Sequence, residues 1–164
     1  METKKLKKLQ ACEEAVEWAA SQKSFSSAWK NCKLGDWMLW LAKRLNIDDR
    51  KLTMAKYHCA AQVLHLMNDQ RSLDAMAAAL KYANGEIDRN ELDVYAAYAD
   101  DAAAASAAAA DYAAAYAAAA AASAAAASAA AAAADDATNS LKKSADICRE
   151  YLTEEVLLSY ENYK

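Results

Sequence analysis

The residue types that carry most protein chemistry are few and widely spaced in this chain. His58 and His65 lie seven residues apart on a predicted helix, with Cys59 beside the first, so the two imidazoles share one helix face. A zinc site needs at least three protein ligands, and no residue is placed to supply the third. The sequence also has no phosphate-binding loop, no nucleophile elbow and no HExxH motif. We therefore predict a protein that is not an enzyme and that uses no metal and no cofactor.

Pairs of adjacent aspartates are the remaining candidates for acid–base chemistry. Adjacent residues on a helix diverge by about 100°, so the two carboxylates of a pair do not face one substrate atom as an acid and a base must. We interpret them as helix caps or solvated charge. The pairs are Asp48-Asp49, Asp100-Asp101 and Asp135-Asp136.

An alanine-rich tract holds the residues that we expect to recognise a partner. Of the 42 residues from 96 to 137, 31 are alanine, which has the strongest intrinsic helix preference. On a continuous helix the tyrosines of this region fall within an arc of about 100°, well away from the aspartates. Tyrosine is enriched where interfaces gain most of their binding energy. The predicted partner-binding residues are Tyr98, Asp100, Asp101, Asp111, Tyr112, Tyr116, Asp135 and Asp136.

That surface has an alternative reading, in which the tyrosines pack on the protein itself and the aspartates face water. The distribution of charged residues along the sequence helps to weigh these two interpretations of the tract. Residues 1–87 carry 14 Lys and Arg against 10 Asp and Glu, whereas residues 88–164 carry 5 against 13. An acidic half disfavours nucleic acid and favours a basic protein partner, although the same charge could serve only to keep the protein soluble.

The composition predicts an all-α, single-domain helical bundle. The chain has no proline and two glycines, and therefore lacks the residues that form tight turns in strand-rich folds. We expect an aromatic-rich bundle over 1–87, an Ala-rich helical segment over 88–137 that is bent or broken, and a C-terminal helix over 138–164 that packs back. The bend is expected near 106–111 or 123–128, since a straight helix of this length outgrows a compact domain.

Capping residues and apolar spacing place the helices of the N-terminal part. We expect helices over about 3–21, 26–33, 36–45, 49–67 and 70–84, and a new helix from residue 88. Gly35 is expected to end one helix, Asn84-Gly85 another, and Asp88 with Glu91 to form a capping box. Five consecutive large apolar residues, Trp37–Leu41, predict that the helix over 36–45 is the most buried.

The cysteines and the N-terminal residues indicate in which cellular compartment the protein is expected. Cys12, Cys32, Cys59 and Cys148 are too widely spaced for a zinc motif, and we interpret them as free thiols of a reducing compartment. No apolar run of signal-peptide length follows the N-terminal lysines. Residues 117–134 form 18 uncharged positions but contain only alanine and serine, which do not drive membrane insertion. These features predict a cytoplasmic protein that does not enter membranes.

Six blocks are distinctive in combination: Glu14-Ala-Val-Glu-Trp18, Ala28-Trp-Lys-Asn-Cys32, Gly35-Asp-Trp-Met-Leu-Trp-Leu41, Met54-Ala-x-x-x-Cys-Ala60, the Tyr-Ala-Ala-Tyr-Ala start of the tract, and Ala145-Asp-Ile-x-Arg149. Over nearly the whole chain they resemble the immunity proteins of bacterial and phage polymorphic toxin systems. The resemblance implies a cytoplasmic antidote that binds a toxin domain and blocks it without catalysis.

Two functions therefore remain open at the level of sequence. The first is a protein-binding inhibitor of the immunity type. The second is a phage-encoded counter-defence protein that binds an immune effector or sequesters a nucleotide signal, with Arg44, Arg50, Lys51 and Trp37 or Trp40 as its basic and aromatic groups. A homo-oligomer is compatible with both.

Overall fold

The predicted all-α class is confirmed in the part of the chain that the computed structural model describes, residues 3–67, 69–104 and 134–163. Only the backbone is described for residues 66, 98–104 and 134–137. The helices are α1 (Lys4–Lys8), α2 (Glu13–Ala20), α3 (Phe25–Asn31), α4 (Gly35–Arg44), α5 (Asp49–Ala61), the short 3₁₀ helix η1 (Leu64–Leu66), α6 (Gln70–Asn84), α7 (Arg89–Ala104) and α10 (Ala134–Asn162).

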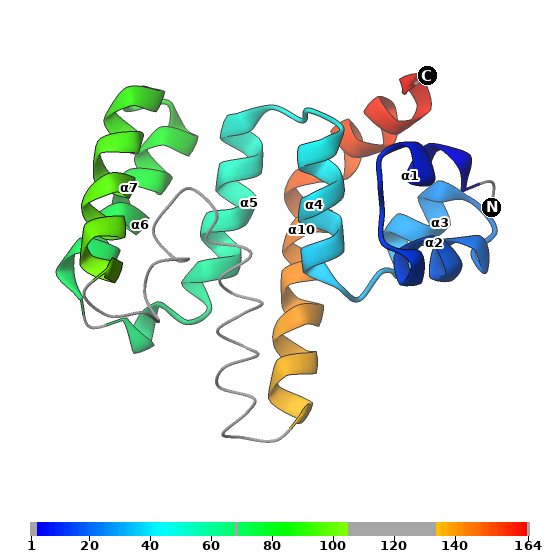
Figure 1. The fold of residues 1–164 in the computed structure, drawn as a ribbon, viewed down its shortest axis with the longest axis horizontal. Coiled ribbons are helices and arrows are strands. Elements are labelled where there is room, and N and C mark those ends of the chain that lie inside the picture. The colour runs from blue at the N-terminus through cyan, green and yellow to red at the C-terminus, as the bar shows by residue number, and fades with distance from the viewer. Residues whose placement is uncertain (1–2, 68, 105–133, 164) are drawn as a thin grey trace.

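The helices follow one another across the molecule in a row. Figure 1 shows the α6–α7 pair at one end, α5 next to it, α4 and α10 side by side in the middle, and α1 to α3 at the other end. The last helix of the sequence therefore lies in the middle of the row, against α3, α4 and α5.

Among the described residues, the most buried stripe lies on α10. Ala145, Cys148, Leu152 and Val156 are each 0% exposed, at spacings of three, four and four residues that keep them on one helix face. The expectation that the helix of residues 36–45 is the most buried is confirmed among the described helices, since five of the ten residues of α4 are buried, a larger share than in any of the others. Residues Met38, Leu39 and Leu41 of α4 are buried, but the two tryptophans between and beside them are only half-buried.

Gly35 is the point of closest approach between α4 and α10. A Cβ atom at this position would lie 2.4 Å from Cβ of Ser144 and 2.9 Å from the backbone nitrogen of Ala145. Gly35 is also the first residue of α4. The expectation that it ends the preceding helix is wrong, because α3 already ends at Asn31. The missing side chain serves helix packing, because only a glycine lets the two backbones come this close.

Local capping chemistry defines several helix ends. Ser24 and Asp48 each accept a hydrogen bond from the backbone N–H three residues on. Asp88 and Glu91 exchange two side-chain to backbone bonds of 2.9 Å in a complete capping box. Gly85 ends α6 with a left-handed φ of 82°, a conformation that glycine adopts without steric cost.

The predicted continuous helix over residues 3–21 is wrong, because the chain breaks between α1 and α2. Gln10 adopts a positive φ of 66° and turns the chain. This break places α1 beside the end of α10, where Lys5 Nζ donates to the carbonyl oxygens of Tyr160 at 2.8 Å and Glu161 at 2.9 Å. Carbonyl groups in the last turn of a helix lack partners within the helix, so a lysine there stabilises the end of α10.

A charged cluster joins α5 to the α6–α7 pair. The Asp49 carboxylate accepts hydrogen bonds from the Tyr82 hydroxyl at 2.7 Å and from Arg89 at 2.9 Å, and Arg89 also pairs with Asp93. Partial burial by itself would raise the pKa of Asp49. The hydrogen bonds from Tyr82 and Arg89 outweigh burial, so the pKa of Asp49 is lowered. The cluster stabilises the contact between α5 and α7 across about forty residues of sequence.

Lys56 lies on the same helix and is 7% exposed. Burial, together with the positive charge of Lys43, lowers the pKa of Lys56 to about 8. A buried ammonium group is costly because water no longer solvates it, and the group loses its proton at a lower pH.

The predicted bend or break of the alanine-rich segment lies outside the described residues. Within them, α7 continues into the segment as far as Ala104, and α10 begins at Ala134.

The variant Gly35→Ala tests the helix crossing. The added methyl group has no space, so we expect a loss of about 1–3 kcal/mol in the free energy of unfolding, measured by urea denaturation followed by tryptophan fluorescence. Combining Gly35→Ala with Ser144→Gly removes the nearest atom but not the backbone of α10, so it should restore part of the loss at most. An unchanged unfolding midpoint for the single variant would show that a methyl group at position 35 fits between α4 and α10.

The variant Lys56→Met tests the buried charge through pH. Between about pH 8 and 10.5 the unfolded wild-type chain holds a proton on Lys56 that the folded chain does not, so raising the pH stabilises the folded wild type. We expect Lys56→Met to be more stable than wild type by up to about 3 kcal/mol near pH 7, and this difference to shrink toward pH 10.5. Urea denaturation of both proteins across this range measures it. If the difference in the free energy of unfolding between the variant and wild type does not change with pH, the lowered pKa of Lys56 is contradicted.

Candidate functional site

All eight residues of the predicted recognition surface lie where the structure describes no side chains. Three of its residues belong to the backbone of α7 and two to the first turn of α10, and the other three lie outside the described residues. The surface therefore stays a prediction. The residues on α7 are Tyr98, Asp100 and Asp101, and those on α10 are Asp135 and Asp136. The residues outside the described part of the chain are Asp111, Tyr112 and Tyr116.

The histidines are not brought together around a common site. The His58 ring stacks on Tyr151 with centroids 4.9 Å apart, whereas His65 is exposed in η1. Cys59 is 0% exposed and points into the core, where its thiol donates to the carbonyl of Ser144. Across the described residues, no group of three or more His, Cys, Asp or Glu side chains is placed to hold a metal ion.

A pocket of about 450 Å³ opens at the other end of the molecule, between α2, α3, α4 and the link from α1 to α2. Its walls are mostly aromatic and include all four tryptophans together with Phe25. Pockets of this size and character are typical of sites that bind small molecules or single side chains. The lining residues are Leu6, Gln10, Ala11, Cys12, Ala15, Trp18, Ala19, Phe25, Ala28, Trp29, Cys32, Asp36, Trp37, Met38, Trp40 and Leu41.

The tryptophans of the pocket have two different roles. Trp29 is 4% exposed, and its indole N–H donates to the Thr153 hydroxyl of α10 at 2.9 Å, so it is a core residue with a satisfied polar group. Trp18, Trp37 and Trp40 are only half-buried. Trp18 and Trp37 meet edge to face, with centroids 6.1 Å apart and an interplanar angle of 62°, and so form a corner of two indoles.

Few polar groups accompany these rings. Asp36 and Gln10 are exposed residues on the pocket wall. Arg44, one turn beyond Trp40 on α4, places its guanidinium group 5.6 Å from the centre of that indole and donates to Oε1 of Gln10 at 3.4 Å. The pocket therefore combines apolar walls with one carboxylate and one guanidinium at its edge.

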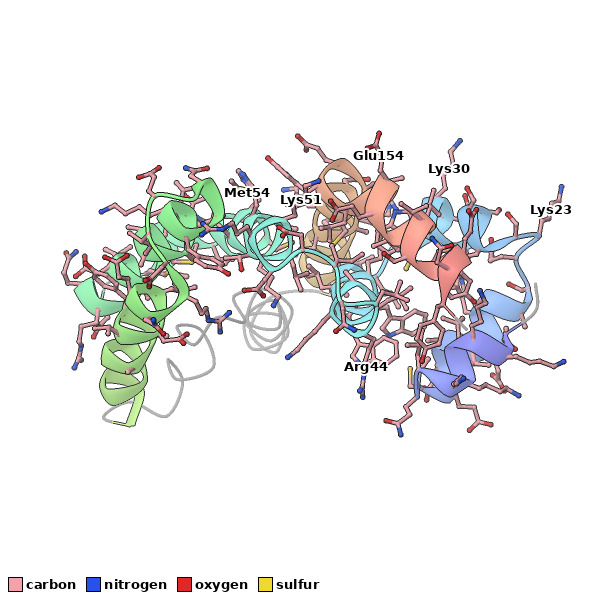
Figure 2. The ribbon with its side chains drawn as sticks, turned by 90° about the horizontal axis from the view of Figure 1, so that it is seen from above. Lys23, Lys30, Arg44, Lys51, Met54 and Glu154 are labelled. Carbon is pink, nitrogen blue, oxygen red and sulfur yellow. The ribbon has the colours of Figure 1, made fainter. Side chains whose placement is uncertain are left out.

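The basic residues proposed for nucleotide binding do not meet at one place. Arg44 lies beside the pocket with Trp40, and Trp37 lines the wall. Lys51 instead pairs with Glu155 of α10, and Arg50 stacks on Tyr82 of α6 at 4.7 Å. Figure 2 shows Arg44 and Lys51 projecting from opposite sides of the molecule. The prediction that these four groups form one nucleotide site is therefore wrong for Arg50 and Lys51.

The pKa values of two buried thiols, Cys32 and Cys148, are raised, so that both are held in their protonated form. Burial raises the pKa of Cys32, whose thiol donates to the carbonyl of Leu34 at 3.5 Å. The hydrogen bond with Cys59, together with burial, raises the pKa of Cys148, which also donates to the carbonyl of Gly35. A protonated thiol is a poor nucleophile, so these cysteines act as packing groups.

The sequence holds a signal for this pocket that the prediction of α4 as the most buried helix did not use. Trp37, Trp40 and Arg44 follow one another at spacings of three and four residues, which places them on one face of the helix. The face opposite carries Met38 and Leu39 into the core. An arginine at the end of an aromatic row is a sign that the row reaches solvent.

No protein family, curated protein or solved structure matches the chain. None of the described helices combines the length and the apolar character that crossing a membrane requires. The resemblance to immunity proteins accordingly rests on the six sequence blocks, and four of those blocks contribute to the pocket or to its support. They are Glu14–Trp18, Ala28–Cys32, Gly35–Leu41 and Ala145–Arg149.

Cys12 offers a chemical test of the pocket. Of the four cysteines it is the exposed one, and it lies on the pocket wall, whereas Cys32, Cys59 and Cys148 are buried. We expect a maleimide to add once to the folded protein, at Cys12, and to change the tryptophan fluorescence because the adduct sits among the indoles. Mass spectrometry of the intact protein and of its peptides measures the site and number of adducts. The variant Cys12→Ser should not react, and a second rapid adduct on the native protein would contradict the burial of the other thiols.

Proposed function

We propose that the chain is a non-catalytic binding protein, an inhibitor of the immunity type, and that it holds a side chain of its protein target in the aromatic pocket. The observation that carries the proposal is the group of three half-buried indoles around a cavity of about 450 Å³. Tryptophan-lined pockets of this kind are where protein interfaces concentrate binding energy, since an inserted side chain is fully desolvated there.

The chemistry of the pocket favours binding over catalysis. Catalysis needs a nucleophile or an acid–base pair with a suitably shifted pKa at the reacting centre. The buried thiol on this wall, Cys32, is held protonated by its surroundings. Aromatic walls with a single carboxylate are suited to holding a group, and holding a toxin or effector is sufficient to block it.

The pocket is also a stronger candidate than the acidic half of the sequence. In the described structure α10 packs against α3, α4 and α5, and Glu155 of α10 pairs with Lys51 of α5, whereas Asp146 pairs with Arg149 within α10. Among the described residues, acidic groups of the C-terminal half therefore lie beside basic groups of the N-terminal half at this contact. A target with a basic surface remains compatible with this arrangement.

The variant Ala15→Phe tests the proposal. Ala15 lies on the pocket wall on α2 and is half-buried, so a phenyl group there fills the cavity without removing a core contact. Toxin domains encoded by neighbouring genes are co-expressed with the chain, and complexes are measured by calorimetry. We expect wild type to rescue growth and Ala15→Phe to bind at least about tenfold more weakly.

The matched control is Ala20→Phe, on the same helix but exposed and outside the pocket. It should rescue growth and bind as wild type does. Rescue and affinity that are equal for Ala15→Phe and wild type would remove the pocket from the mechanism, and failure to bind any neighbouring toxin would remove the immunity function.

One observation favours the second candidate, a counter-defence protein that sequesters a nucleotide. The guanidinium of Arg44 over the Trp40 indole offers a cation for a phosphate next to a ring on which a base can stack. Thermal-shift measurements with cyclic and linear nucleotides test it, with Arg44→Gln as the variant. Stabilisation of wild type by none of them excludes this candidate.

A further inference from the structure

The pocket has an acidic end and a basic end. Asp36, Trp40 and Arg44 follow one another at four-residue intervals along α4, so they form a row on one side of the helix. At a rise of about 1.5 Å per residue, the two charged residues are separated by about 12 Å along the axis. Side chains on a helix lean toward its N-terminus, which brings the Arg44 guanidinium over Trp40 and directs the Trp40 indole toward the turn that holds Asp36.

The charged groups at the two ends are engaged differently. The Arg44 guanidinium lies on the Trp40 indole and donates to Gln10. Asp36 is exposed on the pocket wall, and no hydrogen bond or ion pair joins its side chain to another of the described residues. Some other carboxylates of the described structure, such as those of Asp49 and Asp146, do have basic partners.

The indole corner stands next to this carboxylate. Trp37 and Asp36 both line the pocket, and the Trp37 ring meets Trp18 edge to face. A second exposed carboxylate, Glu14, lies one turn before Trp18 on α2 and so on the same side of that helix. The faces of indole rings attract cations, and tryptophan does so more strongly than the other aromatic residues.

We propose that the pocket selects a cationic side chain, a lysine or arginine of the protein target, which lays its aliphatic stem against Trp18 and Trp37 and its charge against Asp36. This inference rests on the proposed function and specifies the anchor that the pocket reads. It also explains how an inhibitor of mildly acidic net charge selects a basic target without an extended acidic face. The Arg44 end, which already holds a cation, is left for an acidic or carbonyl group of the same target segment.

Matched small probes test the charge requirement directly. Nα-acetyl-lysine N-methylamide carries the ammonium group, and Nα-acetyl-norleucine N-methylamide has nearly the same stem without it. Both are titrated into the full chain and followed by tryptophan fluorescence and by the indole N–H signals in NMR spectra. We expect the lysine probe to bind about 5–10 times more tightly than the norleucine probe, and the preference to fall as salt is added.

The variant Asp36→Asn keeps the shape of the wall and removes its charge. We expect it to lose most of the preference for the lysine probe while its affinity for the norleucine probe is unchanged. Glu17→Gln is the control, since Glu17 is an exposed carboxylate of α2 outside the pocket wall, and it should retain the preference. Thermal unfolding of each variant verifies that it is folded.

The outcomes separate this inference from the function on which it rests. If the norleucine probe binds as tightly as the lysine probe, or if neither binds, the cationic anchor is overturned. In that case a weakened toxin complex of Ala15→Phe still supports docking in the pocket through an apolar side chain. If Ala15→Phe and Asp36→Asn both bind the toxin as wild type does, the pocket is not the docking site and both proposals fall together.

Discussion

The close contact between α4 and α10 determines the rest of this structure. At Gly35 the two backbones approach until no side chain fits between them, and Ser144 and Ala145 fill the other side of the contact. Because α4 is held at this distance, Met38 and Leu39 reach the buried stripe of α10. The opposite face of α4, with Trp37 and Trp40, is turned away from α10 and becomes a wall of the pocket. The site and the core are thus two faces of one helix.

The same arrangement explains why the pocket is suited to holding a ligand. Two thiols are directed into the core, where burial keeps Cys32 protonated and Cys59 donates a hydrogen bond to the α10 backbone. Most of the groups that reach the cavity are rings and aliphatic side chains, and rings lose little conformational entropy when a ligand binds against them. Arg149 of α10 donates to the carbonyl oxygens of Lys30 at 3.2 Å and Cys32 at 2.7 Å and so secures the end of α3 behind the wall.

Features set by neighbouring residues could be predicted from the sequence, and features set by distant contacts could not. The capping box of Asp88 with Glu91 and the helix end at Gly85 depend on three or four consecutive residues, and the structure has them where the sequence predicts them. Gly35 resembles a helix terminator until Ser144, over a hundred residues away, is brought against it. The half-burial of Trp37 depends in the same way on which face α10 covers, and apolar character alone does not reveal it.

The grip of Arg149 on the end of α3 has a consequence for the newborn chain. The donor to the Cys32 carbonyl, Arg149, lies 117 residues downstream. At a synthesis rate of about 5–20 residues per second, Arg149 is added roughly 6–23 s after Cys32. During that interval Trp29 and Gly35 also lack the α10 surface against which they pack. Trp29 therefore lacks its α10 partner on the nascent polypeptide, and folding at the ribosome can be completed only after the C-terminal helix has emerged.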